Sequence, residues 1–282
     1  MATLGLLSEE FPHSSLEENL RIVAGLGIRQ VQFDMLCAVG ETLPAPLDSS
    51  TIESVASSLL SHGIEAAALS GTYNMIDPDP VRRSAGGEGL DRLIALAPQL
   101  KTGIVTLCTG SRDPGDMWKS HPDNNSADAW ADLLPQVARA VETAERHGIV
   151  LGVEPEVSNT VNTPLKARRL LDEIASPHLK IVMDGANIFG KGDFARMGDH
   201  LRATFDLLGE DIVLAHAKDV DQEGEAGSLP AGLGRLDFPL YFDLLKQSGY
   251  NGAIILHALD QAQAPTALSF VRKNSPVGYV EG

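Results

Sequence analysis

The sequence has few of the features that mark secreted or membrane proteins. It contains two cysteines among 282 residues, Cys37 and Cys108, which lie far apart and in no CxxC pattern. We therefore expect both thiols to be reduced and packed as small apolar groups, as is typical of a cytosolic protein. No apolar run reaches the roughly 18 residues that a membrane-spanning helix needs. The first residues show neither a basic segment nor a long apolar run, so we expect no secretory signal, no membrane partner and a cytoplasmic location.

Positive charge is also scarce. The chain has 22 Lys and Arg against 38 Asp and Glu, which gives a formal net charge of −16. The densest basic runs are the pairs Arg82-Arg83 and Arg168-Arg169. Because a nucleic acid repels an acidic surface that has no concentrated basic patch, we expect no nucleic-acid partner. The share of hydrophobic residues, 43%, is otherwise typical of a globular chain with a sizeable core.

Short apolar runs alternate along the chain with longer stretches of helical period. Eight runs have the length and composition of buried strands: residues 3–7, 30–35, 65–70, 104–109, 150–155, 180–186, 213–218 and 253–258. Helix start signals lie between them, such as Ser15, Asp237, and Thr163 followed by Pro164. Eight strand–helix units in a chain of this length favour a closed parallel barrel. We therefore predict an α/β fold, a single-domain (β/α)8 TIM barrel over residues 1–282.

Glycine-rich segments give no sign of an open dinucleotide-binding sheet. Such a sheet usually has a Gly-rich turn after its first strand, where this chain has Ser8, Glu9 and Glu10. The run Gly86-Gly87-Glu88-Gly89 follows no strand, and we predict that it interrupts a helix.

Strand alternation predicts which side chains point into the barrel. Because the helix-facing set must be apolar, the other set faces the interior. On the second strand this rule directs Gln32 and Asp34 inward. On the last four strands the inward residues near the C-terminal end are ionisable: Glu154, Asp184, His216 with Lys218, and His257. Burying these charges without partners costs several kcal/mol, and a divalent cation with carboxylate and imidazole ligands is the simplest partner. Barrel enzymes keep their active sites at this rim.

Two roles are open for His257. As a neutral imidazole it would be a fourth metal ligand beside Glu154, Asp184 and His216, in a shell that suits manganese, iron or zinc better than magnesium. Alternatively it would act as a general acid or base, since its pKa can be set near neutrality. We predict one divalent metal ion, Mn²⁺ in the first place, with Zn²⁺, Fe²⁺, Co²⁺ and Mg²⁺ as alternatives.

Loops on the same side of the barrel supply candidates for substrate binding. The loop 110–125 after the fourth strand is long and polar, and loops of this length are often functional. We predict that it closes over the substrate, with Arg112 or His121 in contact. Asn74 after the third strand and Glu156 just beyond Glu154 are further candidates. An ordinary surface loop is the alternative interpretation.

Four motifs occur in a fixed order along the second half of the chain. They are Val153-Glu154-Pro155, Met183-Asp184-Gly185-Ala186-Asn187, His216-Ala217-Lys218-Asp219 and Gly232-Leu233-Gly234-Arg235-Leu236-Asp237-Phe238. This ordered set resembles the xylose isomerase-like barrel superfamily of sugar phosphate isomerases and epimerases, which includes D-tagatose 3-epimerase, inosose dehydratase and endonuclease IV. The resemblance covers nearly the whole chain and implies that Glu154, Asp184 and His216 bind the metal. It also implies a glutamate where His257 stands, and usually a histidine where Asn187 stands, so the chain departs from the pattern there.

The resemblance implies a metal-dependent isomerase or epimerase of a keto-sugar or sugar derivative. In that mechanism Glu154 or His257 takes a proton, an enediolate forms, and Lys218 stabilises the developing oxyanion. A lyase or dehydratase acting on a related keto-polyol shares this first step. A nuclease of the endonuclease IV type is disfavoured, because the net charge of this chain is negative and would repel DNA. A non-catalytic binding barrel is the remaining alternative. The expected partner is a small sugar-like molecule, and the oligomeric state is open, a homodimer included.

Overall fold

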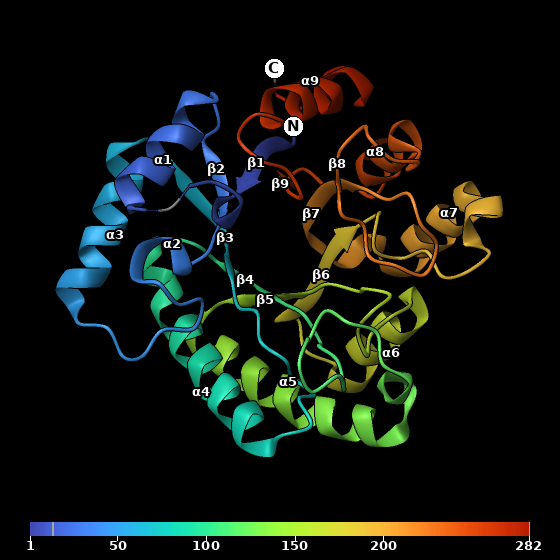
Figure 1. Ribbon diagram of the computed structural model, residues 1–282, viewed down its shortest axis with the longest axis horizontal. Helices are drawn as coiled ribbons and strands as arrows, with labels where there is room; N and C mark the ends of the chain where they lie inside the picture. The colour runs from blue at the N-terminus through green and yellow to red at the C-terminus, as the bar shows by residue number, and fades with distance from the viewer. Residues whose placement is uncertain (13, 282) are drawn as a thin grey trace.

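The computed structural model, which describes residues 1–12 and 14–281, is a closed barrel of parallel strands (Figure 1). The barrel strands are β1 (Thr3–Leu7), β2 (Gln30–Phe33), β3 (Glu65–Ser70), β4 (Ile104–Leu107), β5 (Val150–Val153), β6 (Leu179–Asp184), β7 (Ile212–Asp219) and β9 (Ala253–Leu256). Each strand from β1 to β7 pairs with the next, and β9 pairs with β7 and β1, which closes the ring. The predicted (β/α)8 barrel is confirmed, with strand ends shifted by one or two residues at several positions.

A short additional strand was not predicted. It is β8 (Leu229–Pro230), which lies antiparallel beside the end of β7 through the pairs Lys218–Pro230 and Asp219–Leu229. Its two residues are too few to show a period, so no sequence pattern indicates it. The strand fastens the long loop between β7 and the next helix over the C-terminal end of the barrel.

Helices form the outer ring around the strands (Figure 1). They are α1 (Leu16–Gly25), α2 (Leu36–Val39), α3 (Ser49–Ser61), α4 (Pro80–Leu96), α5 (Ala127–His147), α6 (Pro164–Ile174), α7 (Met197–Leu208), α8 (Phe238–Gln247) and α9 (Ala264–Asn274). Short 3-10 turns cover Ser8–Glu10, Ala97–Leu100, Pro122–Asn125, Asp193–Arg196 and Gly209–Asp211. The predicted caps are confirmed, because Ser15, Thr163 and Asp237 accept hydrogen bonds from backbone N–H groups in the first turns of α1, α6 and α8.

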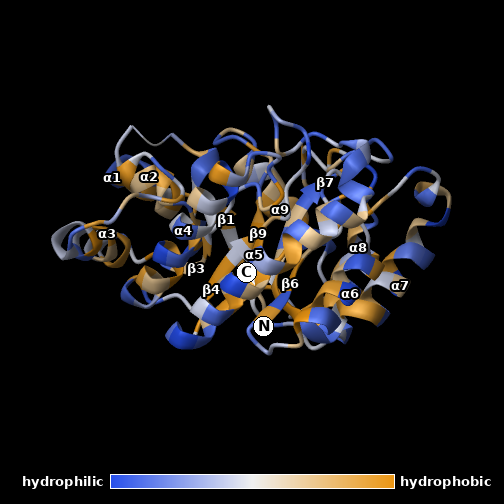
Figure 2. Ribbon diagram, turned by 90° about the horizontal axis from the view of Figure 1, so that it is seen from below, coloured by the Kyte–Doolittle hydropathy of each residue, from blue (hydrophilic) through white to orange (hydrophobic). Residues whose placement is uncertain are grey.

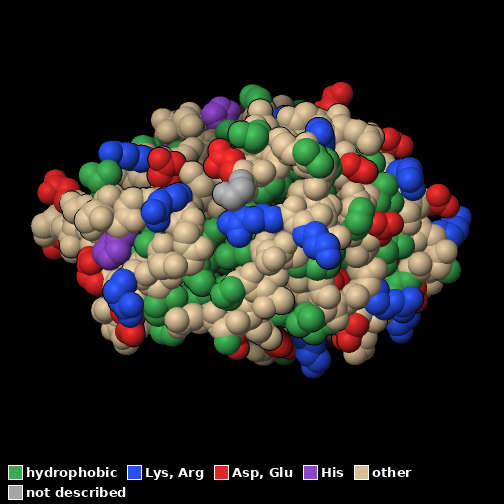
Figure 3. All heavy atoms as spheres, turned by 90° about the horizontal axis from the view of Figure 1, so that it is seen from above, with side chains coloured by type: hydrophobic (Ala, Val, Ile, Leu, Met, Phe, Trp, Pro, Cys, Tyr) green, Lys and Arg blue, Asp and Glu red, His purple; other side chains and the backbone are tan. Residues whose placement is uncertain are grey.

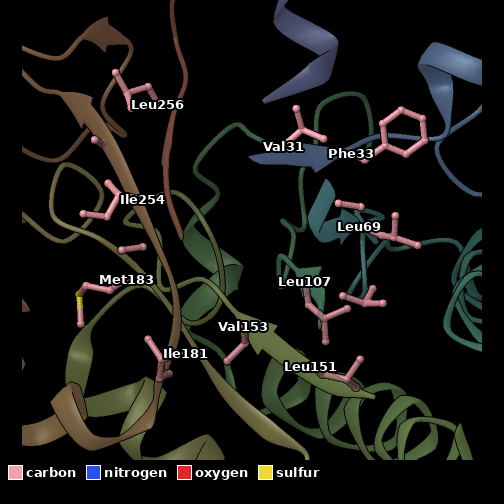
Figure 4. Packing of buried hydrophobic residues seen from close by; sticks show 14 of the residues in the cluster. Val31, Phe33, Leu69, Leu107, Leu151, Val153, Ile181, Met183, Ile254 and Leu256 are labelled. Atoms are coloured by element: carbon pink, nitrogen blue, oxygen red, sulfur yellow. The ribbon is translucent and has the colours of Figure 1, made fainter. Parts of the chain in front are cut away.

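The apolar side chains divide into two layers, as the strand alternation predicts. Ile181, Met183, Ile254 and Leu256 face the helices in the main core (Figure 4). The residues between them belong to a separate cluster inside the barrel: Leu7, Ala68, Val182, Leu214, Ala253 and Ile255. Figure 2 shows this arrangement from the side, with hydrophobic strands enclosed by helices of mixed hydropathy. The inner cluster fills the lower part of the barrel and leaves the polar groups at the C-terminal end.

The prediction that residues 86–89 interrupt a helix is wrong, because α4 continues through them. The glycines serve close packing instead. A Cβ atom on Gly86 would overlap the ring of Tyr73, and one on Gly89 would lie 2.9 Å from Cβ of Leu43. Tertiary contact therefore outweighs the low helix propensity of glycine at these positions.

Both cysteines are buried and free, as expected. Within residues 1–12 and 14–281, no helix combines the length and the hydropathy needed to cross a membrane. On the face drawn in Figure 3, Lys and Arg side chains are scattered among Asp and Glu.

Candidate metal centre and active site

The four predicted metal ligands meet at the C-terminal end of the barrel. Asp184 ends β6 and stands opposite His216 of β7 in the strand register. Glu154 directly follows β5, where its backbone N–H donates to the carbonyl of Leu107 on β4, and His257 directly follows β9. Because the ends of successive parallel strands lie side by side, residues up to 103 positions apart in the chain share one site.

Asp184 lies at the centre of this cluster. Its Oδ2 atom is 3.2 Å from Nε2 of His257, 3.4 Å from Nζ of Lys218 and 3.6 Å from Nδ1 of His216. Its Oδ1 atom accepts the backbone N–H of Ala186 at 2.8 Å, which fixes the carboxylate. Glu154 completes the group, with Oε2 3.5 Å from Nδ1 of His216. Asp184, His216 and His257 each offer a ligand atom within 4.8 Å of the others.

His216 is the residue that tests whether a metal fits. Its Nε2 atom is 2.9 Å from Oε1 of Gln32, whose own amide nitrogen donates to Ser70 at 3.1 Å. This orientation makes Gln32 an acceptor, so Nε2 carries a proton. The other ring nitrogen, Nδ1, is buried and has no hydrogen-bond partner among the described residues, although it faces the carboxylates of Glu154 and Asp184. A nitrogen held toward two carboxylates matches a divalent cation with mixed imidazole and carboxylate ligands.

Electrostatics in the cluster agree with this interpretation. Burial alone would lower the pKa of His216, but Glu154 and Asp184 raise it to about 9. A proton therefore occupies Nδ1 at neutral pH when no metal is bound, and a metal bound there would displace it. His257 differs, because burial and the ammonium of Lys218 lower its pKa to about 4 and keep the ring neutral. A neutral imidazole has a lone pair for a metal or for a proton, so both predicted roles of His257 remain open.

Lys218 and Glu156 lie beside the cluster in the same cavity. Burial disfavours the ammonium of Lys218, but Asp184, Glu154 and Glu156 raise its pKa above the usual value and keep it charged. Burial raises the pKa of Glu156 to about 8, so this carboxyl group is protonated at neutral pH. Its Oε1 atom accepts from the amide of Asn159 at 3.0 Å. The cavity therefore contains a charged donor and a neutral acid in addition to the metal ligands.

Asn187 has a role that the sequence did not reveal. Its Nδ2 atom donates to Oε1 of Glu154 at 2.6 Å, and its Oδ1 accepts the N–H of Gly227 at 3.0 Å. It therefore orients Glu154 and holds the β7–α8 loop at once, at a position where the family resemblance implies a histidine. Gln32 was likewise predicted to point inward, but no function was assigned to it.

Asp219 organises the β7–α8 loop at the mouth of the cavity. Its two carboxylate oxygens accept backbone N–H groups from Val220, Gly232, Gly234 and Leu236 at 2.8–3.0 Å. A Cβ atom on Gly234 would lie 2.5 Å from Oδ1 of Asp219, so only glycine fits there. These contacts explain why the third and fourth motifs occur together.

The turn beside His257 is fixed by a hydrogen bond between Glu10 and Ala258, which we call the latch. The next residue, Ala258, has φ +56°, a left-handed conformation that costs a non-glycine residue about 1 kcal/mol or more. Its N–H donates to Oε1 of Glu10 at 2.8 Å, from the turn that follows β1. Glu10 therefore stabilises a strained turn directly beside a candidate ligand.

The cavity above the cluster has a volume of about 290 Å³, which is the size of a small-molecule site. Gln32, Thr106 and His216 lie on its barrel side, and Glu154, Glu156, Lys218 and His257 contribute charge or acidity. Three further parts of its lining come from loops: Thr72, Trp118, and the segment Ala226, Gly227 and Ser228.

Three predicted substrate-binding residues are absent from the described lining of this cavity: Asn74, Arg112 and His121. Asn74 donates to the carbonyl of Ser111 at 2.7 Å, and Arg112 binds the carbonyl of Ile76 and the carboxylate of Asp132. His121 accepts the N–H of Asp123 and begins a 3-10 turn.

These contacts fasten the loops that follow β3 and β4 to each other. From the loop 110–125 it is Trp118 that reaches the cavity, with 49% of its surface exposed. Substrate contact by Asn74, Arg112 or His121 stays a prediction.

Comparison with known families agrees with the fold. The chain belongs to the xylose isomerase-like TIM barrel family, whose model matches residues 20–274. The resemblance inferred from the four motifs is thereby confirmed.

Individual relatives are sugar epimerases. The chain is 24% identical over 227 residues to a ketose 3-epimerase of Arthrobacter globiformis, which covers 77% of this chain and 72% of that protein. It is 24% identical over 200 residues to L-ribulose-5-phosphate 3-epimerase of Shigella flexneri, covering 71% of this chain and 65% of the relative.

Solved structures show the same fold. The crystal structure of 3-keto-D-glucoside 4-epimerase from E. coli aligns with a TM-score of 0.73 and 21% identity, over 97% of this chain and 100% of that one. An L-ribulose 3-epimerase aligns with a TM-score of 0.74 and 20% identity, over 97% and 94% of the two chains.

Proposed function

We propose that this chain is a metal-dependent epimerase or isomerase of a keto-sugar or keto-sugar derivative. The observation that carries the proposal is the cluster of Asp184, His216 and His257, whose ligand atoms lie within 4.8 Å of one another. Glu154 lies beside it, and a ring nitrogen of His216 is turned toward the carboxylates of Glu154 and Asp184. The curated relatives, which are ketose and ketose-phosphate epimerases, support the same class of reaction.

Glu154, Asp184 and His216 would hold the metal, with His257 as a fourth ligand or as an acid–base group. A divalent ion bound there supplies a Lewis acid that polarises the substrate carbonyl and its neighbouring hydroxyl. Manganese fits a shell of two carboxylates and two imidazoles, as do zinc and iron.

Glu154 is the best-placed base. Burial would raise its pKa, but the nearby His216 lowers it below the usual value, so the carboxylate is ionised at neutral pH. Asn187 holds one oxygen of this carboxylate and leaves the other on the side of the cluster. Glu154 takes the proton from the carbon next to the carbonyl, and an enediolate forms.

The remaining groups stabilise the enediolate and return the proton. Lys218 is charged and donates a hydrogen bond to the oxygen that becomes negative. Glu154 on the β5 side and His257 on the β9 side flank Asp184 and His216, so they approach a bound carbon from different directions. An epimerisation needs one group to remove the proton and a second, protonated group to return a proton to the opposite face. Glu156, which keeps its proton at neutral pH, is the acid of the cavity that would supply it.

A deuterium-exchange experiment tests the proposal. The purified chain is loaded with Mn²⁺ and incubated in D₂O with free and phosphorylated ketoses, and mass spectrometry follows deuterium uptake and the products. We expect uptake at the carbon next to the carbonyl together with an epimer or an isomer. Loss of water from the sugar would instead indicate a dehydratase.

A variant pair connects this activity to the metal. Asp184→Asn should lose metal content and exchange together, whereas Asp243→Asn, at an exposed position of α8, should keep both. Equal metal content in these two variants, measured by elemental analysis, would remove the proposed metal centre.

A further inference from the structure

We propose that the site takes an uncharged keto-sugar and discriminates against the same sugar with a terminal phosphate group. This inference rests on the proposed function, because it assumes that the keto end of the substrate lies against the metal cluster. The two curated relatives act on a free ketose and on a ketose phosphate by name, so the family leaves the choice open.

The cavity contains little positive charge. Lys218 is the one Lys or Arg in the described part of its lining. Its ammonium is buried and lies 3.4 Å from Oδ2 of Asp184. The ammonium of Lys218 therefore pairs with the carboxylates of the cluster and with the oxygens at the reacting end of the sugar. It has no free charge for a second anion.

The mouth of the cavity is formed by side chains that are poor phosphate ligands. When the keto group lies at the cluster, the far end of a ketose reaches the mouth, which is formed by Trp118, Ala226, Gly227 and Ser228. An indole ring and small side chains offer apolar contact and one hydroxyl group. The N–H of Gly227 already donates to Asn187, so this amide is not free to bind a phosphate oxygen. Arg and Lys side chains are common phosphate ligands, and the described lining has neither at the mouth.

The charged side chains around the mouth also disfavour a phosphate group. The cations on the Trp118 loop have acidic partners: Arg112 lies 2.6 Å from Asp132, and Lys119 lies 3.1 Å from Asp113. On the opposite loop, the exposed Glu225 directly precedes Ala226. A phosphate dianion at the mouth would therefore compete with carboxylates for cations that are already paired. Like charges brought close together disfavour binding of the ester.

Matched pairs of substrates test the inference. The full-length protein loaded with Mn²⁺ is given L-ribulose or L-ribulose 5-phosphate, and D-fructose or D-fructose 6-phosphate, in D₂O. We expect kcat/KM for deuterium exchange to be at least about 100-fold higher for the free sugar of the accepted pair. Equal or faster exchange of the phosphate ester would overturn the inference while leaving the proposed function intact.

A binding measurement separates the two proposals if no sugar exchanges. Saturation-transfer NMR on the Mg²⁺-loaded protein compares the same pairs without the need for turnover. Binding of the free sugar in preference to its ester would keep the inference and remove the epimerase proposal. Preferred binding of the ester, or binding of neither, would overturn the inference.

A positive charge added at the mouth should increase turnover of the phosphate ester. Ser228→Arg supplies the missing cation, and Ser228→Gln is the uncharged control of similar length. We expect Ser228→Arg to raise the ratio of ester to free-sugar turnover by about tenfold or more over the control. The same ratio in both variants would contradict the role that we assign to the missing charge.

Discussion

Replacing Gln32 by leucine should weaken metal binding without removing any ligand. Gln32 Oε1 lies 2.9 Å from Nε2 of His216, and the amide is itself held by Ser70. This hydrogen bond keeps one proton on Nε2, so the proton on Nδ1 is the one that would leave when a metal binds. In Gln32→Leu the buried Nε2–H has no acceptor, and the neutral ring gains by moving its proton to Nδ1, the atom that the metal needs.

The size of the effect follows from the cost of leaving the Nε2–H of His216 without a hydrogen-bond acceptor. A buried polar group without a partner costs about 1–3 kcal/mol, which metal binding must overcome to restore the correct form of the ring. This corresponds to roughly the 10–100-fold loss of affinity that is typical when a hydrogen-bond partner of a metal ligand is removed.

Competition with a fluorescent chelator measures the Kd for Mn²⁺ and Zn²⁺ directly. Gln32→Glu keeps an acceptor at the same place and should retain tight binding, whereas Ser70→Ala should give an intermediate loss. Unchanged affinity in Gln32→Leu, with the same thermal unfolding as wild type in EDTA, would refute the assignment of Nδ1 as the ligand atom.

Three further predictions follow from the same site. Because metal binding displaces the proton of His216, whose pKa is about 9 in the metal-free protein, apparent affinity should rise by up to about tenfold per pH unit and level off near pH 9; calorimetry at several pH values checks this. Glu156 keeps a proton in the folded chain that the unfolded chain releases, so the stability of metal-free wild type should fall as pH rises from 4.5 to about 8. The fall should be smaller in Glu156→Gln, and equal slopes in chemical denaturation would exclude a buried neutral acid. Glu10→Ala should lower the Tm and weaken metal binding, Ala258→Gly added to it should recover part of both, and no recovery would exclude strain at Ala258 as the cause.

The sequence could predict the barrel and the inward ionisable residues at its C-terminal end because both depend on strand alternation. The apolar outward residues of the last four strands leave Glu154, Asp184, His216 and His257 on the inner face by parity alone, and strand order then brings them together.

Contacts between loops could not be predicted in this way. Arg112 has the composition of a substrate-binding residue, but its partner Asp132 lies on α5, and only packing in three dimensions brings the two together. Gln32 and His216 are separated by 184 positions in the chain, so no local pattern relates them.

The latch between Glu10 and Ala258 has a consequence for biosynthesis. Glu10 and Ala258 are 248 positions apart, and β1 pairs with β9 only after both strands have been synthesised. A truncated chain that lacks β9 still contains Glu154, Asp184 and His216 but has neither His257 nor the turn that aims it. High-affinity metal uptake would therefore report that the ring of strands has closed.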